Sequence, residues 1–359
     1  GGHGSALPGS ALPSWSPESI PIRNPSGSHG CLLDEMTGEG AIGTTASAQL
    51  QVMLTCLGIA ALTIPYLFAQ VGWGLGISIL AMPAIMSCLS MRQIVYLGEA
   101  SGQKGMAGAF SPYLGGKVSG LLSWILFMLC EFIVAACMAI PCDILPNLSK
   151  DIDWFPTVSK EVVGLAIVAG SAIAGFAKDL SALDKLLKPS IFLIIYLMIA
   201  VVVRACAHGA GHEMELVAWE NPKQSFSKRA MDCLATAMAA FGAECAILAI
   251  YANTAPRFRR PIETWSAKVI DLPMCLMMLI YVVFGFAGYS EYGAGVEPNL
   301  LKTMGSEWWA IVAKVGLSFV NAFRVPLFNI VQWYTILDVL PGLAKLEAEW
   351  CGIGRTLVL

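Results

Sequence analysis

Eight long apolar stretches run through the sequence, and they constrain the fold more than any other feature. Each one reaches or approaches the roughly 20 apolar residues that a helix needs to cross a hydrocarbon core of about 30 Å. Hydrophobic residues make up 56% of the chain and charged residues 13%, a composition too apolar for a soluble domain of this size. We therefore predict an all-α, polytopic membrane protein. The expected spans are residues 46–71, 74–97, 118–140, 162–177, 189–207, 231–252, 269–290 and 308–335.

The two ends of the chain lack such stretches. Residues 1–45 are rich in Gly, Pro and Ser and show no hydrophobic periodicity, which predicts a disordered tail. Residues 46–340 form the predicted transmembrane domain, and residues 341–359 form a short carboxyl-terminal tail. Basic residues gather in the loops after the second, fourth and sixth spans. By the positive-inside rule these loops face the cytosol, which places the amino-terminal tail in the cytosol as well.

The first span contains two residues that disfavour a continuous helix. Gly58 and Pro65 lie in it, where a membrane helix should continue without a break. Proline has no amide hydrogen and its ring clashes with the preceding turn, whereas glycine resists neither bending nor unwinding. Non-helical backbone at this depth is tolerated only where protein or a water-filled cavity satisfies it. A break in this span therefore indicates a substrate site.

The sixth span carries a similar signal together with a charge. Residues 235–243 are mostly small and include Gly242, and the carboxylate Glu244 follows inside an otherwise apolar stretch. An ionisable group at mid-membrane is costly unless it faces a cavity or a partner. Glu244 is therefore a functional candidate. The alternative is a structural carboxylate paired with a buried cation such as Lys314 or Arg324.

Two interrupted helices in matching positions of two halves predict a binding site at the membrane midplane. The pattern suits a zwitterion, because free N–H groups at the start of the outer half-helix would attract a carboxylate. Unpaired carbonyls at the breaks would attract an ammonium group or a cation. An aromatic side chain could then close over the aliphatic part of the substrate. The predicted substrate-binding residues are Gly58, Ala60, Ala61, Leu62, Tyr66, Phe241, Gly242 and Glu244.

Four residues are candidates for coupling transport to an ion. Glu244 could titrate, and Glu131 in the third span could relay protons, although a hydrogen bond to a neighbouring helix explains Glu131 equally well. Ser318 and Asn321 in the eighth span could offer oxygen ligands to Na⁺. The alternative for these two is a hydrogen bond back to their own backbone, as is common in membrane helices.

Other kinds of function find little support in the residues. No CxxC pair occurs among the 11 cysteines, and most of them lie in apolar spans, where core packing explains them. Neither a metal cluster nor a nucleophile paired with a base is visible in the spans. We therefore expect no enzymatic activity, no metal and no cofactor. The expected partners are a small molecule, H⁺ or Na⁺, and membrane lipid, with no nucleic acid.

Several motifs resemble those of a known family. Residues 58–73 resemble the first-helix signature of the amino acid/auxin permease family, usually written G-x-G-x-L-x-[LI]-P-Y-A-F-A-Q-x-G-W. Residues 241–251 are similar to the sixth helix of that family, and residues 288–293 match the G-Y-x-x-[FY]-G at the end of its seventh. Residues 325–327, Val-Pro-Leu, resemble its eighth. The resemblance runs in order through most of the predicted transmembrane domain.

The resemblance implies a fold like that of the transporter LeuT, with inverted repeats and broken first and sixth helices. It also implies secondary transport of amino acids driven by H⁺ or Na⁺, in the plasma membrane or in a vacuolar or lysosomal membrane. A membrane sensor that binds an amino acid without transporting it is the alternative.

This sequence departs from the family pattern in three places. Ala60 replaces the second glycine of the first helix, which leaves less room for backbone to approach a substrate. Glu244 stands where many members have His, and Cys245 and Ala249 replace nearby prolines. A carboxylate there would titrate, favour a cationic substrate, or both. The family's ninth to eleventh helices do not follow residue 340, so we expect a core that is truncated in its second repeat.

Overall fold

The computed structural model describes residues 43–103, 105–152, 156–175, 180–208, 214–218 and 225–339. Within these ranges the regular structure is helical, apart from one isolated bridge between Gly43 and Thr254. The all-α prediction is therefore confirmed for this part of the chain. The two predicted tails lie outside the described residues except at 43–45, and Thr45 already begins the first helix.

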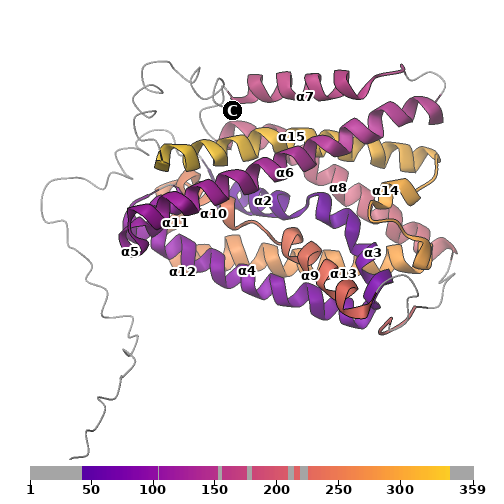
Figure 1. Ribbon diagram of the computed structural model, residues 1–359, viewed down its shortest axis with the longest axis horizontal. Helices are drawn as coiled ribbons and strands as arrows, with labels where there is room; N and C mark the ends of the chain where they lie inside the picture. Colours follow the sequence, from indigo (N-terminus) through magenta and orange to yellow (C-terminus); the bar gives the residue numbers. More distant parts are fainter. Residues whose placement is uncertain are drawn as a thin grey trace, which may run out of the picture.

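Long helices run roughly along one axis of the molecule (Figure 1). They are α4 (Trp73–Ser101), α6 (Gly116–Asp151), α8 (Leu180–His208), α13 (Leu272–Tyr292) and α15 (Trp308–Val339). Helix α15 packs along α6 and α8, and α13 packs against α8. Helix α7 (Lys160–Gly175) lies at the outer edge of the bundle in Figure 1, against α6 and α15. The core is therefore organised around α15 and α13.

Six helical segments in the described residues are long and apolar enough to cross a membrane, and a bent pair brings the number to at most 7. Helix α7 has 16 residues, fewer than the roughly 20 that a span usually needs. The predicted total of eight therefore stays a prediction. The third span is longer than expected, because α6 continues past residue 140 to Asp151.

The first span is broken, and this prediction is confirmed. Helix α2 (Thr45–Cys56) ends before Gly58, a 3₁₀ turn follows (η2, Ile59–Thr63), and α3 (Ile64–Val71) completes the segment. The two halves meet at an angle of 49°. Pro65 lies in the first turn of α3, where its missing N–H costs no intrahelical hydrogen bond. The proline therefore starts the second half of the span, α3, and the break precedes it.

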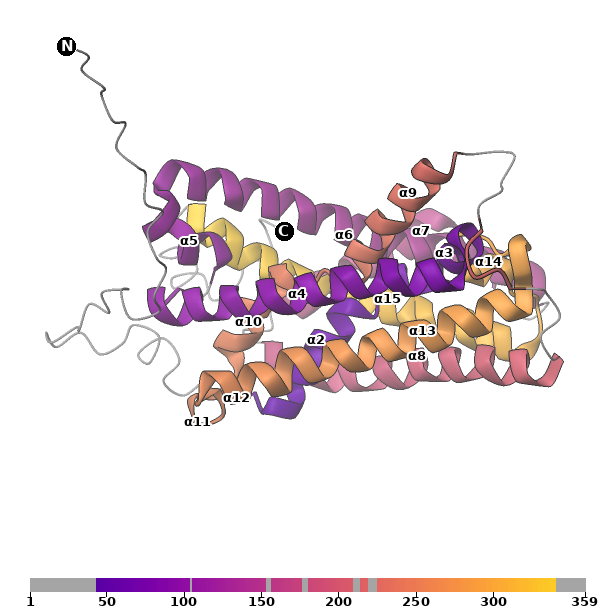
Figure 2. The same ribbon diagram turned by 90° about the horizontal axis from the view of Figure 1, so that it is seen from below.

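The sixth span is broken as well. Helix α9 (Phe226–Ala240) ends before α10 (Glu244–Asn253) begins, and the three residues between them are not helical. Figure 2 shows α9 running obliquely to α4. Helix α9 packs against α3 and η2, while α10 packs against α2. The two breaks therefore lie close together, in the middle of the bundle.

Short helices and ion pairs close the end of the molecule that we predict to be cytosolic. This end holds α5 (Met106–Leu114), α11 (Pro256–Arg259), α12 (Ile262–Ser266) and the π-helical turn η3 (Ala267–Asp271). Arg92 of α4 forms an ion pair with Asp271. Glu99, also on α4, accepts hydrogen bonds from Tyr251 at 2.7 Å and from Arg260 at 3.0 Å. These contacts hold α4 against α10, the end of α11 and the turn η3.

A second charged cluster ties three helices together at the opposite end. Arg204 of α8 donates to Glu291 of α13 and to Glu307, which precedes α15, with both distances at 2.6 Å. Its guanidinium also lies over the Trp309 ring, 5.0 Å from the centroid. The same end holds η4 (Gly293–Gly295) and α14 (Leu300–Thr303).

Large apolar side chains are exposed on the outer faces of the long helices. They include Leu121, Trp124 and Phe132 on α6, Leu165 on α7, and Phe192 and Val203 on α8. Soluble proteins rarely expose contiguous apolar surface on this scale. These faces therefore suit contact with lipid acyl chains, as expected for a polytopic membrane protein.

Candidate functional site

A cavity of about 290 Å³ lies at the two helix breaks. The end of α2, the turn η2, the half-helix α9, and the long helices α6 and α15 all contribute to its wall. Most of the lining side chains are small or apolar, and the one charged residue among them is Arg324. The lining residues are Thr55, Cys56, Gly58, Ala60, Thr63, Ile133, Ala136, Cys137, Thr236, Ala239, Gly242, Arg324 and Phe328.

The structure separates the five predicted residues of the first span. Gly58 and Ala60 line the cavity. Ala61 and Leu62 are buried and belong to the main hydrophobic core instead. Tyr66 borders a smaller cavity of about 40 Å³, which adjoins the first one along α3 and α9. Tyr66, one of the aromatic side chains expected to close over the substrate, therefore lies beside the cavity and not in its wall.

A tyrosine that the sequence interpretation did not include connects the two breaks. The Tyr281 hydroxyl lies 2.7 Å from the carbonyl oxygen of Cys56, at the end of α2, and 3.3 Å from that of Ala240, at the end of α9. Tyr281 is fully buried, and its ring packs edge-on against Phe241 with centroids 5.3 Å apart. Phe241 therefore packs in the hydrophobic core beside the break and does not line the cavity, whereas its neighbour Gly242 does.

Glu244 begins α10 and lies half-buried beside α4, outside the lining of the cavity. Ser87 Oγ is 2.6 Å from Glu244 Oε1 and 2.7 Å from the carbonyl oxygen of Phe241. Ser90 Oγ is 3.2 Å from the same carboxylate oxygen. One serine hydroxyl therefore joins the carboxylate to the non-helical backbone of the sixth span.

The ion pair considered for Glu244 is not formed with either of the two cations named in the sequence. Arg324 Nη2 donates to the carbonyl oxygen of Thr55 at 2.7 Å. Lys314 Nζ donates to the carbonyl oxygen of Gly305 at 3.2 Å. Among the described residues, the hydrogen-bond partners of the Glu244 carboxylate are serine hydroxyls.

Arg324 is a residue of the cavity that the sequence interpretation treated only as a counter-ion. It lies near the middle of α15, with an exposed fraction of 4%. The signal that could have identified it is the one that singled out Glu244, an ionisable group inside an apolar span. Its position against the first break depends on the packing of α15, which a single sequence does not reveal.

The other three ion-coupling candidates lie away from the cavity lining. Glu131 is exposed on α6. Ser318 Oγ donates to the carbonyl of Lys314 at 2.8 Å, and Asn321 Nδ2 donates to that of Leu317 at 2.9 Å. Both side chains therefore bond back to their own helix, which was the alternative interpretation.

Comparison with known protein families identifies the family of this chain. Residues 42–336 match the family described as transmembrane amino acid transporter protein. The chain belongs to this family. The match covers both broken spans, so the resemblance seen in the sequence motifs is confirmed. No curated protein matches the chain significantly.

Membership of the transmembrane amino acid transporter family establishes the general activity. Members of this family are transporters and not enzymes, and they carry amino acids across membranes. The protein is therefore an integral, multi-pass membrane transporter for amino acids.

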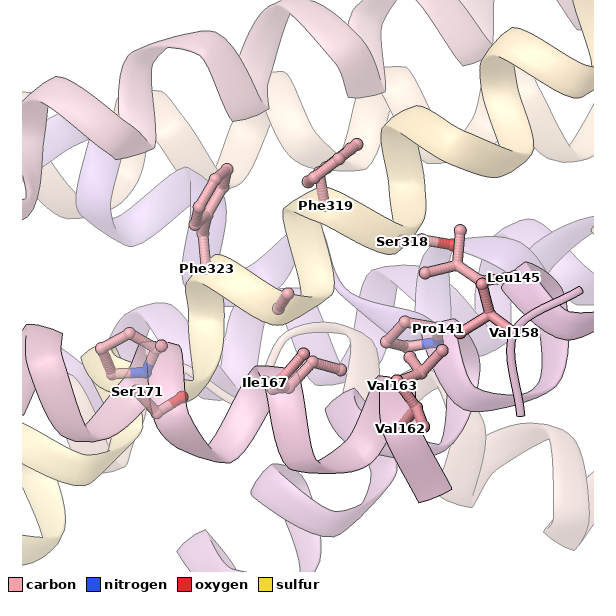
Figure 3. Close-up of a pocket in the computed structure, with 14 residues that line it drawn as sticks. Pro141, Leu145, Val158, Val162, Val163, Ile167, Ser171, Ser318, Phe319 and Phe323 are labelled. Atoms are coloured by element: carbon pink, nitrogen blue, oxygen red, sulfur yellow. The ribbon is translucent and has the colours of Figure 1, made fainter. Parts of the chain in front are cut away.

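This transporter also contains a larger cavity, of about 360 Å³, between α6, α7 and α15 (Figure 3). Phe319 and Phe323 stack there with ring centroids 6.2 Å apart, and Ile167 of α7 lines the opposite side. Ser171 and Ser318 supply the side-chain hydroxyls of its lining, and none of its lining residues is charged. This cavity suits an apolar group, so the cavity at the breaks is the better candidate for an amino acid.

Removing the Tyr281 hydroxyl should destabilise the transporter. In Tyr281→Phe, the buried Ala240 carbonyl loses this donor, and the Cys56 carbonyl keeps only its hydrogen bond from the Gly58 N–H. An unsatisfied buried acceptor costs about 1–3 kcal/mol. The measurement is the Tm of the purified protein in detergent. Tyr292→Phe is the matched control on the same helix, because the Tyr292 hydroxyl is buried without a hydrogen-bond partner among the described residues. An equal Tm for both variants would contradict the bridging role of Tyr281.

Proposed function

We propose that this transporter is a secondary active symporter that couples amino acid movement to protons. The substrate site in this proposal is the cavity at the two breaks, and Glu244 carries the proton. The observation that supports the proposal best is the position of the Ser87 hydroxyl, within hydrogen-bond distance of both Glu244 and the Phe241 carbonyl.

The single hydroxyl proton of Ser87 couples the protonation of Glu244 to the hydrogen bonding of the break in the sixth span. A hydroxyl has one proton to donate. When Ser87 donates it to the Phe241 carbonyl, the 2.6 Å contact with Glu244 requires a proton from the carboxyl group. When Glu244 is ionised, Ser87 donates to the carboxylate, and the Phe241 carbonyl loses this partner. Protonation of Glu244 therefore changes the hydrogen bonding of the sixth-span break.

The surroundings of the first break favour H⁺ over Na⁺ as the coupling ion. A bound cation would need the carbonyls that the break frees at the end of α2. The Arg324 guanidinium already donates to one of them, that of Thr55. A second positive charge within a few ångströms would be repelled, and the repulsion is strong in a low-dielectric interior. Ser318, one of the two predicted Na⁺ ligands, lines the larger apolar cavity instead.

Reconstitution of the purified protein into liposomes tests the proposal. Uptake of each of the twenty radiolabelled amino acids is measured with an alkaline interior, with and without Na⁺. We expect at least one amino acid to accumulate above its external concentration without Na⁺, and a protonophore to abolish the accumulation. Accumulation that depends on Na⁺ and ignores the pH gradient would contradict proton coupling. Binding without accumulation under any gradient would indicate the sensor.

A further inference from the structure

The wall of the substrate cavity holds one fixed positive charge. Arg324 is the charged residue among those that line the cavity, and it is almost fully buried near the middle of α15. A buried cation at this depth is expensive unless an anion or several acceptors compensate it. The partners of its guanidinium therefore indicate what the cavity is built to bind.

The guanidinium has more donors than acceptors in its surroundings. Of its five N–H donors, Nη2 uses one on the Thr55 carbonyl at 2.7 Å. The Nε atom is buried and has no hydrogen-bond partner among the described residues. The Phe328 ring lies 5.5 Å from the guanidinium carbon and covers one of its faces. Among the described residues, the guanidinium therefore contacts one neutral carbonyl and one aromatic face, and no anion.

Glu244 does not serve as this anion. Its carboxylate is held by Ser87 and Ser90 of α4, outside the lining of the cavity. Arg324 instead donates to the Thr55 carbonyl near the end of α2. The two charged groups therefore bind different helices and do not pair with each other.

The three threonines that line the cavity complement the guanidinium. Each hydroxyl donates its proton to a carbonyl of its own segment: Thr55 to Gln51 and Thr63 to Ala60, both at 2.7 Å, and Thr236 to Asp232 at 3.0 Å. Their oxygen atoms retain lone pairs, so they can accept hydrogen bonds but not donate them to an anion. Arg324 is therefore the strong side-chain donor of the cavity.

We propose that the Arg324 guanidinium binds the α-carboxylate of the transported amino acid, an inference that rests on the transport function proposed above. The planar fork of a guanidinium matches a carboxylate and can bind it with two parallel hydrogen bonds. The threonine oxygens supply acceptors for the α-ammonium group. This assignment places the carboxylate on α15, whereas the sequence alone placed it at the amino end of α3.

The same lining sets the class of side chain. The lining residues other than Arg324 are uncharged, so a charged substrate side chain would remain unpaired in the cavity. The volume of about 290 Å³ is at the small end of the range for ligand sites. The substrate class that fits is therefore a neutral amino acid with a small or medium-sized side chain.

Competition between free acids and carboxamides tests the assignment in proteoliposomes. L-Alanine and L-leucine are each compared with their carboxamides as inhibitors of uptake. The wild type should prefer the acid at least about 10-fold, and Arg324→Gln should raise KM by roughly 10- to 100-fold and lose that preference. Arg324→Lys keeps the charge without the fork and should retain part of the preference. Arg257→Gln, which removes an exposed charge at the cytosolic end, should change neither value.

A labelling experiment on the wild-type protein keeps the proposal testable if the Arg324 variants do not fold. Phenylglyoxal modifies arginine side chains, and mass spectrometry locates the adduct. L-Alanine should protect Arg324 from modification, and L-alaninamide should not. An Arg324→Gln protein with unchanged KM and preference, or equal labelling with and without L-alanine and L-leucine, would overturn the inference. Failure of every amino acid to accumulate in wild-type proteoliposomes would instead contradict the proposed function. The two failures are distinguishable, because protection from labelling requires substrate binding but no transport.

Discussion

Replacing Gly58 with alanine is expected to lower amino acid affinity by roughly 10-fold or more while the protein still folds. A Cβ atom at this position would lie 2.7 Å from both Cζ and Nη2 of Arg324 and still closer to Nη1. The guanidinium ends a flexible side chain, so it can withdraw from the clash. Withdrawal breaks the hydrogen bond to the Thr55 carbonyl and moves the charge away from the cavity wall. The expected loss is therefore in KM, together with a lower Tm, because the buried Thr55 carbonyl loses its charged donor.

Two further variants make the Gly58→Ala result specific. Gly120→Ala adds the same methyl group to a membrane helix at a position where a Cβ would meet nothing within 4 Å, so it should behave like the wild type. The double variant Gly58→Ala with Arg324→Gln should be no worse than Arg324→Gln alone, because the two changes affect one interaction. Additive losses in this cycle, or a normal KM for Gly58→Ala, would show that Gly58 does not act through Arg324.

Replacing Glu244 with glutamine is expected to abolish proton-driven accumulation and to preserve exchange of amino acids across the membrane. The glutamine amide can donate to Ser87 as a protonated carboxyl group does, so the hydrogen bond from Ser87 to Phe241 is retained at every pH. A gradient of one pH unit supplies about 1.4 kcal/mol per proton, enough for roughly 10-fold accumulation at one proton per amino acid. The variant should show none, although counterflow of labelled substrate should persist.

The control for Glu244→Gln is the same change at another glutamate of the predicted spans. Glu131 is exposed on α6 and does not line the cavity, so Glu131→Gln should leave the pH profile of uptake unchanged. Ser87→Ala should weaken proton coupling, because it removes the hydroxyl that connects the carboxyl group to the break. Wild-type accumulation by Glu244→Gln under a pH gradient would remove Glu244 from the coupling role.

The breaks in the two spans could be predicted because their causes are local. Gly58 and Pro65 disfavour a continuous helix at their own positions, and Gly242 does so in the sixth span. The structure places non-helical backbone at both sites. The exact role of Pro65 was different from the expected one, because it begins the second half-helix, α3.

The contacts that define the site could not be predicted in the same way. Arg324 reaches the Thr55 carbonyl across 269 positions of sequence, and Tyr281 reaches the Cys56 carbonyl across 225. The sequence does not show whether a serine or tyrosine in an apolar helix forms a hydrogen bond with its own backbone or with another span. Ser318 bonds to its own helix, whereas Ser87 bonds to the sixth span.

The amino-acid sequence by itself determined the helical class, the membrane setting and the two breaks, because apolar length, glycine and proline act within one or two helical turns. The strongest family motif lies in the first of these segments, and the motifs together indicated amino acid transport. Only the tertiary structure decided which side chains meet at the breaks, since the packing of α15 and α4 brings Arg324 and Ser87 to them. The packing of these helices depends on many weak contacts between segments that are distant in sequence. The side chains of the cavity wall are therefore known only once the bundle is assembled.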